Sequence, residues 1–179
     1  MWSWVLYTVS LNICGFITHI YLLNYINMRL SKNFSLHEIT RSDTATRLGI
    51  DNEPSKEHLQ NLQNLITEVV QPMRDKLGPI RVSSGYRSPL LNSTIGGSNK
   101  SRHCKGQALD LQFWEGGKMN NKRIYDWIID NGLEFDQMIN EFDFAWIHLS
   151  LKEKGNRKQI LEAYKDDDNE TNYKVVDGK

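Results

Sequence analysis

The chain has 179 residues, which is enough for one domain with a hydrophobic core. Lys and Arg together number 22, as do Asp and Glu, so the formal net charge is zero. A protein that binds the phosphate backbone of a nucleic acid is expected to carry an excess of basic residues, so the composition argues against nucleic acid as a partner. The two cysteines, Cys14 and Cys104, lie in different contexts and do not suggest a disulfide framework.

Residues 1–27 form an apolar N-terminal segment without Lys, Arg, Asp or Glu, and its length fits a membrane span of about 20 residues. It lacks the basic start and the small-residue cleavage site of a signal peptide. The first positive charges, Arg29 and Lys32, follow it and would hold the rest of the chain in the cytoplasm. A translation start assigned upstream of Met28 is our leading interpretation, and a membrane anchor is the alternative. The folded domain is therefore expected in residues 28–179.

Two helices are predicted next. Ser35 and Glu38 have the spacing of a capping box, which predicts a short helix ending near Arg41, followed by a polar connection over residues 42–54. Ser55 caps a longer helix that stops at residues 78–79. Its apolar residues recur every three to four positions and predict a core-facing stripe: Leu59, Leu62, Ile66, Val69, Val70, Met73 and Leu77.

The second half reads mainly as strands. Strands are predicted over residues 80–83, 108–113, 135–142 and 146–151, with a helix capped by Asn120 or Asn121 before the third. Residues 158–164 and 171–176 predict a last hairpin around an acidic, solvated turn. Between the first two strands, glycines and a proline predict a long loop, and such loops are usually functional.

Three residues around this loop have the chemistry of a metal site. His103 ends the loop, Asp110 lies in the following strand, and His148 is at the centre of a later one. Imidazole nitrogen and carboxylate oxygen are good zinc ligands, and a catalytic zinc site uses three protein ligands.

The same region contains an ordered set of segments: SGYRS over residues 84–88, Leu91-Asn92, Gly96-Gly97, Ser101-x-His103-x-x-Gly106-x-Ala108-x-Asp110, and WIHLS over residues 146–150. This set resembles the zinc D-alanyl-D-alanine carboxypeptidase family, and most of all its bacteriophage and prophage members, the endolysin-like peptidoglycan peptidases. The resemblance covers roughly residues 28–164. It implies that His103, Asp110 and His148 bind zinc and that Arg87 contacts the substrate.

Further residues are candidates for contacts with the substrate. Arg87 carries a permanent, forked charge that can grip a peptide carboxylate or a developing oxyanion. Ser101 either orients a ligand or the substrate or caps the loop, and Tyr86 either contacts the substrate or packs.

Glu141 is the predicted general base. Many relatives place the catalytic acid three residues before the second histidine, where this chain has Ala145. A hairpin with a two-residue or a four-residue connection would pair Glu141 directly with His148. Asp143, in the turn, is the alternative base.

These observations predict an α+β domain: a small antiparallel sheet with helices packed on one side, in a hedgehog or D-Ala-D-Ala carboxypeptidase-like zinc peptidase fold. The expected function is zinc-dependent hydrolysis of amide bonds in peptidoglycan stem peptides, as a carboxypeptidase or an endopeptidase, by a monomer. The alternative is a non-catalytic zinc module that binds peptidoglycan or serves as a structural phage protein. The expected location is the host cytoplasm with action on the cell wall, or the membrane if residues 1–27 anchor the chain.

Overall fold

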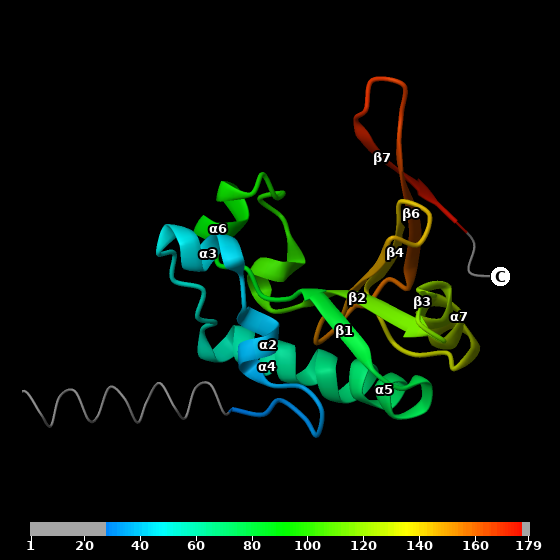
Figure 1. Ribbon diagram of the computed structural model, residues 1–179, viewed down its shortest axis with the longest axis horizontal. Coiled ribbons are helices and arrows are strands. Elements are labelled where there is room, and N and C mark those ends of the chain that lie inside the picture. The colour runs from blue at the N-terminus through cyan, green and yellow to red at the C-terminus, as the bar shows by residue number, and fades with distance from the viewer. Residues whose placement is uncertain (1–27, 177–179) are drawn as a thin grey trace, which may run out of the picture.

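The computed structural model describes residues 28–176, so the apolar segment 1–27 lies outside the described residues. Its helices are α2 (Leu36–Thr40), α3 (Asp43–Leu48), α4 (Lys56–Leu65), α5 (Gln71–Leu77), α6 (Pro89–Thr94) and α7 (Lys122–Asp130), with a π-helical segment η1 (Ile66–Val70) and a 3-10 turn η2 (Arg102–Lys105). Its strands are β1 (Ile80–Ser84), β2 (Ala108–Glu115), β3 (Lys118–Met119), β4 (Gln137–Glu141), β5 (Trp146–Ser150), β6 (Gln159–Lys165) and β7 (Thr171–Val175) (Figure 1).

The sheet has the order β1-β2-β5-β4-β6-β7, with β3 paired to the far end of β2. The α+β class is confirmed, but the prediction of a wholly antiparallel sheet is wrong because β4 and β6 run parallel. β5 is antiparallel to β4 and therefore ends beside the start of β4. The short connection 151–158 delivers the chain to that same end, so β6 has to run in the direction of β4.

Side-chain caps begin the early helices as the sequence predicts. The Ser35 hydroxyl accepts a hydrogen bond from the Glu38 amide, and the Ser55 hydroxyl accepts one from the His58 amide. The prediction of a polar connection without a helix over residues 42–54 is wrong in part, because this segment contains α3. Ser42 caps this helix, and Ala45 is its one buried residue, so the sequence shows no apolar period there.

One face of the sheet holds the main core. The buried side chains of α4, η1, α5 and α7 pack in one cluster with alternate residues of β2, β4 and β5, among them Leu62, Ile66, Met73, Ile124, Ile128, Leu109, Leu111, Met138, Ile147 and Leu149. The intervening residues of these strands face the other side, where Ile139, Leu161 and Ala163 form a small second cluster. The sheet therefore has one face covered by helices and packed with apolar side chains, and an opposite face on which polar residues can form a site.

The long loop after β1 is more ordered than predicted, because it contains α6 and η2. At the C-terminal end, β6 and β7 form the predicted hairpin, which projects from the body of the molecule (Figure 1). Within residues 28–176, the helices are all too short or too polar to cross a membrane.

Candidate active site

His103 is held at the end of the loop by the turn η2. Its side chain is 2% exposed. Gly106 ends the turn with φ +65°, and a Cβ at this position would lie 2.2 Å from the His58 carbonyl oxygen. Glycine is therefore required both by the left-handed backbone and by the close approach of α4. The His-x-x-Gly spacing of the sequence thus reflects how this turn seats against α4.

A second glycine fixes the direction of the His103 ring. The Nδ1–H of His103 donates to the carbonyl oxygen of Gly85 at 2.7 Å. A Cβ on Gly85 would lie 2.1 Å from the Ile39 carbonyl oxygen, so only glycine allows this close approach of the two backbone segments. Since Nδ1 carries the proton of the neutral ring, Nε2 presents a lone pair to the site, as in many metal-binding histidines.

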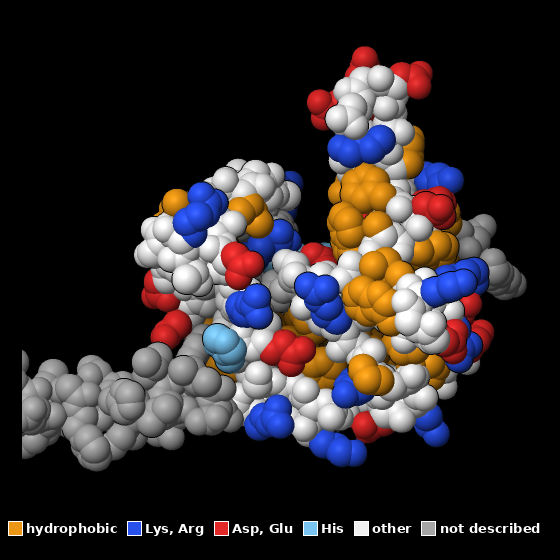
Figure 2. Space-filling view, in the orientation of Figure 1, with side chains coloured by type: hydrophobic (Ala, Val, Ile, Leu, Met, Phe, Trp, Pro, Cys, Tyr) orange, Lys and Arg blue, Asp and Glu red, His pale blue; other side chains and the backbone are white. Residues whose placement is uncertain are grey.

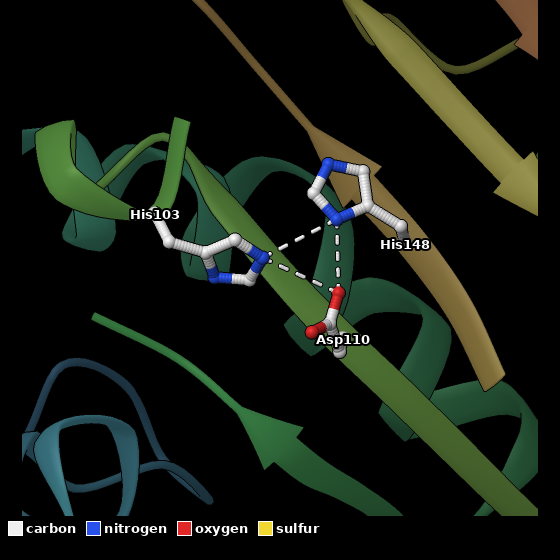
Figure 3. A group of neighbouring side chains, drawn as sticks. All are labelled: His103, Asp110 and His148. Carbon is white, nitrogen blue, oxygen red and sulfur yellow. Dashed lines mark hydrogen bonds and ion pairs between the residues drawn. The ribbon is translucent and has the colours of Figure 1, made fainter. Parts of the chain in front are cut away.

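Asp110 and His148 come from neighbouring strands. They are directly paired in the register of β2 and β5. Asp110 Oδ1 lies 2.9 Å from His148 Nδ1 and 3.3 Å from His103 Nε2, and the two nitrogens are 3.3 Å apart. Figure 3 shows the three side chains pointing toward one another from η2, β2 and β5. The structure therefore brings together the three residues predicted to bind a metal.

This donor set fits zinc. Zinc binds imidazole nitrogen and carboxylate oxygen at about 2.0–2.2 Å in a tetrahedral shell, which separates neighbouring ligand atoms by about 3.3 Å. The three separations observed here are close to that value, and all three atoms lie within 4.8 Å of one another. Three possible ligand atoms gathered this closely favour a cation between them.

The protonation states also suit a cation. Burial lowers the pKa of His103, and this effect outweighs the opposing charge of Asp110, which keeps the ring neutral. Burial alone would raise the pKa of Asp110, but the two histidines outweigh it and hold the pKa well below its usual range. A neutral imidazole and an ionised carboxylate are the forms that bind a metal.

Glu141 lies on the same face of the sheet, but the predicted register was wrong. Glu141 pairs with Trp146, and His148 pairs with Ile139. The turn uses residues 142–145, in which Phe142, Asp143 and Phe144 all have positive φ values. The sequence contains no glycine there that would have indicated such a turn. Glu141 is thus diagonal to His148, at a typical separation of about 7–8 Å that a long side chain can cross.

Glu141 is 8% exposed and lines a cleft of about 850 Å³ together with His103, Asp110 and His148. Burial raises its pKa to about 7, with the charge of His148 opposing this rise and that of Asp110 adding to it. Asp143 is exposed in the turn and does not line the cleft.

The other predicted residues occupy different places. Arg87 and Ser101 line the cleft, and the Nε atom of Arg87 is buried without a hydrogen-bond partner within the described chain. Tyr86 is 4% exposed and belongs to the core, where its hydroxyl lies 3.2 Å from His58 Nδ1. Ser101 and Arg87 are therefore placed to meet a ligand, and Tyr86 supports the site from behind.

The cleft is also lined by residues that the sequence did not single out. From the loop these are Ile95, Ser98, Lys100 and Arg102, and from the later turn and strands they are Phe142, Trp146, Thr171 and Tyr173. Figure 2 shows the hollow between the part of the molecule that contains α3 and α6 and the projecting β6–β7 hairpin. The strand register, which links β7 through β6 to β4, places Thr171 and Tyr173 at the site.

Comparison with known proteins agrees with this geometry. Residues 32–150 match the family described as Peptidase M15. A 44-residue stretch is 48% identical to the zinc D-Ala-D-Ala carboxypeptidase of Streptomyces albus G, covering 24% of this chain and 17% of that protein. The chain thus matches less than a fifth of the relative's length. Both matches imply zinc as the cofactor, which the donor set fits. Since the family match covers more than half of the chain and includes His103, Asp110 and His148, the chain belongs to the peptidase M15 family.

Proposed function

We propose that the protein is a zinc peptidase that hydrolyses amide bonds in peptidoglycan stem peptides, as a D-Ala-D-Ala carboxypeptidase or an endopeptidase with a hedgehog-type fold. The observation that carries the proposal is the placement of a protonatable carboxyl, Glu141, in the same cleft as the His103, Asp110 and His148 set. The substrate class rests on the name of the bacterial relative and on the family motifs. A role in phage-type cell-wall degradation is part of this proposal.

Zinc held by His103, Asp110 and His148 would polarise the scissile carbonyl and lower the pKa of a water molecule. The chain itself supplies the proton transfers. Glu141, whose pKa burial raises to about 7, accepts the proton of the attacking water and returns it to the leaving amine. General acids and bases act best when their pKa is close to the pH of the medium. The buried position of Glu141 raises its pKa toward neutral pH.

Arg87 holds the substrate in this mechanism. Arg87 lines the cleft, so its permanently charged guanidinium group can pair with a bound carboxylate or a developing oxyanion. Ser101 lines the same side and adds a hydroxyl group.

The test compares two carboxylates of one turn. Glu141→Gln should leave zinc content and thermal stability close to wild type while turnover of purified muropeptides falls by about 10²–10⁴-fold, as expected for loss of a general base. Asp143→Asn, at the exposed turn position, should change turnover by only a few-fold. Mass spectrometry of the released fragments identifies the bond. The reverse ranking would make Asp143 the base, and near-wild-type rates in both variants would refute this mechanism.

A zinc-loaded wild-type protein that releases no fragment from peptidoglycan would favour the alternative, a non-catalytic module that binds wall peptides. Glu141 argues for catalysis, because a binding module has no need of a buried carboxyl with a raised pKa in the cleft.

A further inference from the structure

A row of paired residues crosses the sheet beside the metal ligands. Trp146 of β5 pairs with Glu141 of β4, Glu141 pairs with Ala163 of β6, and Ala163 pairs with Tyr173 of β7. Residues paired in this way lie side by side on one face of a sheet. Tyr173 is therefore two strands from the proposed general base, and a single methyl side chain stands between them.

The small residue in this row leaves room for the ring. Ala163 is only 1% exposed although its side chain is short, so its larger neighbours cover it. Tyr173 lines the cleft that holds Glu141 and the three metal-binding residues, and Thr171 lines it two positions earlier on the same face of β7. The charges of Glu141 and Asp110 also raise the pKa of the Tyr173 phenol, after the larger effect of burial. The phenol is thus within the electrostatic reach of the site and stays protonated.

Half of Tyr173 is nevertheless free to meet a ligand, since 53% of it is exposed. It lies on the β6–β7 hairpin, beyond residues 32–150 that match the family. This hairpin projects beside the hollow, opposite the part of the molecule that contains α6 (Figure 2). A chain that crosses the metal-binding residues would therefore pass along the inner face of β7.

We propose that Tyr173 is a substrate-binding residue that the C-terminal hairpin adds to the cleft, with its ring as a wall for the bound stem peptide and its hydroxyl hydrogen-bonded to that peptide's backbone. The inference rests on the proposed function for its choice of ligand. A peptide backbone presents both donors and acceptors, and a phenol can supply either partner. An aromatic ring adds contact area at a low cost in conformational entropy.

The same hairpin offers a matched control. Tyr164 belongs to β6 and is 44% exposed, but it follows Ala163 and so points to the opposite face, away from the cleft-lining residues. Substitutions of Tyr164 and Tyr173 change the same residue type on the same hairpin. Only the substitution of Tyr173 changes the face of the sheet that lines the cleft.

The experiment measures binding and turnover of a synthetic stem pentapeptide ending in D-Ala-D-Ala. Binding is measured by calorimetry with the zinc-loaded Glu141→Gln protein, in which turnover is suppressed, and turnover is measured with Glu141 intact. Tyr173→Phe should weaken binding by about 2- to 10-fold, the effect of one hydrogen bond. Tyr173→Ala should weaken it by about 10- to 100-fold, because the ring contacts are also lost. In turnover, both should raise KM more than they lower kcat, with zinc content unchanged.

Tyr164→Phe and Tyr164→Ala should bind and turn over the peptide like the protein with both tyrosines. If Tyr173→Ala matches these controls while the pentapeptide is cleaved, the inference is wrong and the proposed function stands. If the pentapeptide binds in a Tyr173-dependent way but wild type cleaves neither it nor purified peptidoglycan, the proposed function fails and the inference stands. Absence of both binding and cleavage overturns both.

Discussion

The orientation of one ring decides the chemistry of the metal-binding residues. His103 donates its Nδ1–H to the Gly85 carbonyl, which leaves Nε2 facing Asp110 and His148. Such a backbone partner typically fixes the tautomer of a metal-binding histidine. The sequence identified the three ligand candidates by type and order. It could not identify Gly85 as the orienting partner, because that contact is made by a backbone atom.

The first prediction concerns these ligands. His103→Ala or His148→Ala should lose most of the approximately one zinc that the wild-type protein holds, since two ligands leave an incomplete shell. Metal analysis after gel filtration measures this. His37→Ala is the control, because His37 lies outside the metal-binding group. Full zinc occupancy in both site variants would refute the assignment.

The second prediction uses the pKa of Glu141 in the metal-free protein. Its folded value of about 7 lies above its ordinary value of 4.5. Between these values the unfolded chain loses the proton first, so the contribution of Glu141 to the free energy of unfolding falls as pH rises. Glu141→Gln cannot ionise and should escape this fall.

Urea denaturation in the presence of a chelator tests this prediction. The stability of Glu141→Gln relative to wild type should increase from pH 5 to about pH 7 and level off above that pH. Other titrating groups are common to both proteins and cancel in the difference. Parallel stability curves would mean that the carboxyl is solvated.

At the scale of elements, the capped and periodic segments were predictable and the turns were not. The stripe from Leu59 to Leu77 predicted one helix, and α4, η1 and α5 follow it without a break. The turn after Glu141 was misjudged because three residues other than glycine adopt positive φ there. Two asparagines hold that turn: Asn140, just before it, accepts from the Phe144 amide, and Asn121 donates to the Phe144 and Ala145 carbonyls. The contacts of Asn121 span more than 20 positions and leave no local signal in the sequence.

The third prediction concerns the turn that seats His103. Gly106→Ala should lower the free energy of unfolding by about 2–5 kcal/mol, the sum of about 1–2 kcal/mol for a left-handed residue with a Cβ and about 1–3 kcal/mol for overpacking against the His58 carbonyl. Gly132 has φ +60° and open space around it, so Gly132→Ala should cost only the first amount. Equal losses, measured by chemical denaturation, would show that the turn can shift away from α4.

At the scale of the whole molecule, one buried carboxylate joins segments that are far apart in the sequence. Asp136 is fully buried and accepts two hydrogen bonds from the Arg157 guanidinium, both at 2.8 Å. Lys152 Nζ lies 2.8 Å away, and Arg102 of η2 lies 3.8 Å away. Asp136 thus ties the start of β4 to the connection that makes β6 parallel and to the turn that carries His103. This role of Asp136 could not be predicted from the sequence, because its partners lie 16 to 34 positions away.

Removal of this carboxylate is the last prediction. Asp136→Asn leaves the surrounding cations without their partner and should lower the free energy of unfolding by about 3–5 kcal/mol at pH 7. Glu134→Gln is the control, because Glu134 and Lys158 form an exposed pair that contributes at most about 1 kcal/mol.

Burial alone would raise the pKa of Asp136, but hydrogen bonds from Arg157 and Lys152 outweigh the effect of burial and hold the pKa at about 2, below the ordinary 3.8. The stabilisation is therefore complete above about pH 5 and is lost as pH falls toward 2. Denaturation curves should show the gap between wild type and Asp136→Asn narrowing between pH 5 and pH 3, and a gap that stays constant over this range would mean that the cations do not depend on the charge of Asp136.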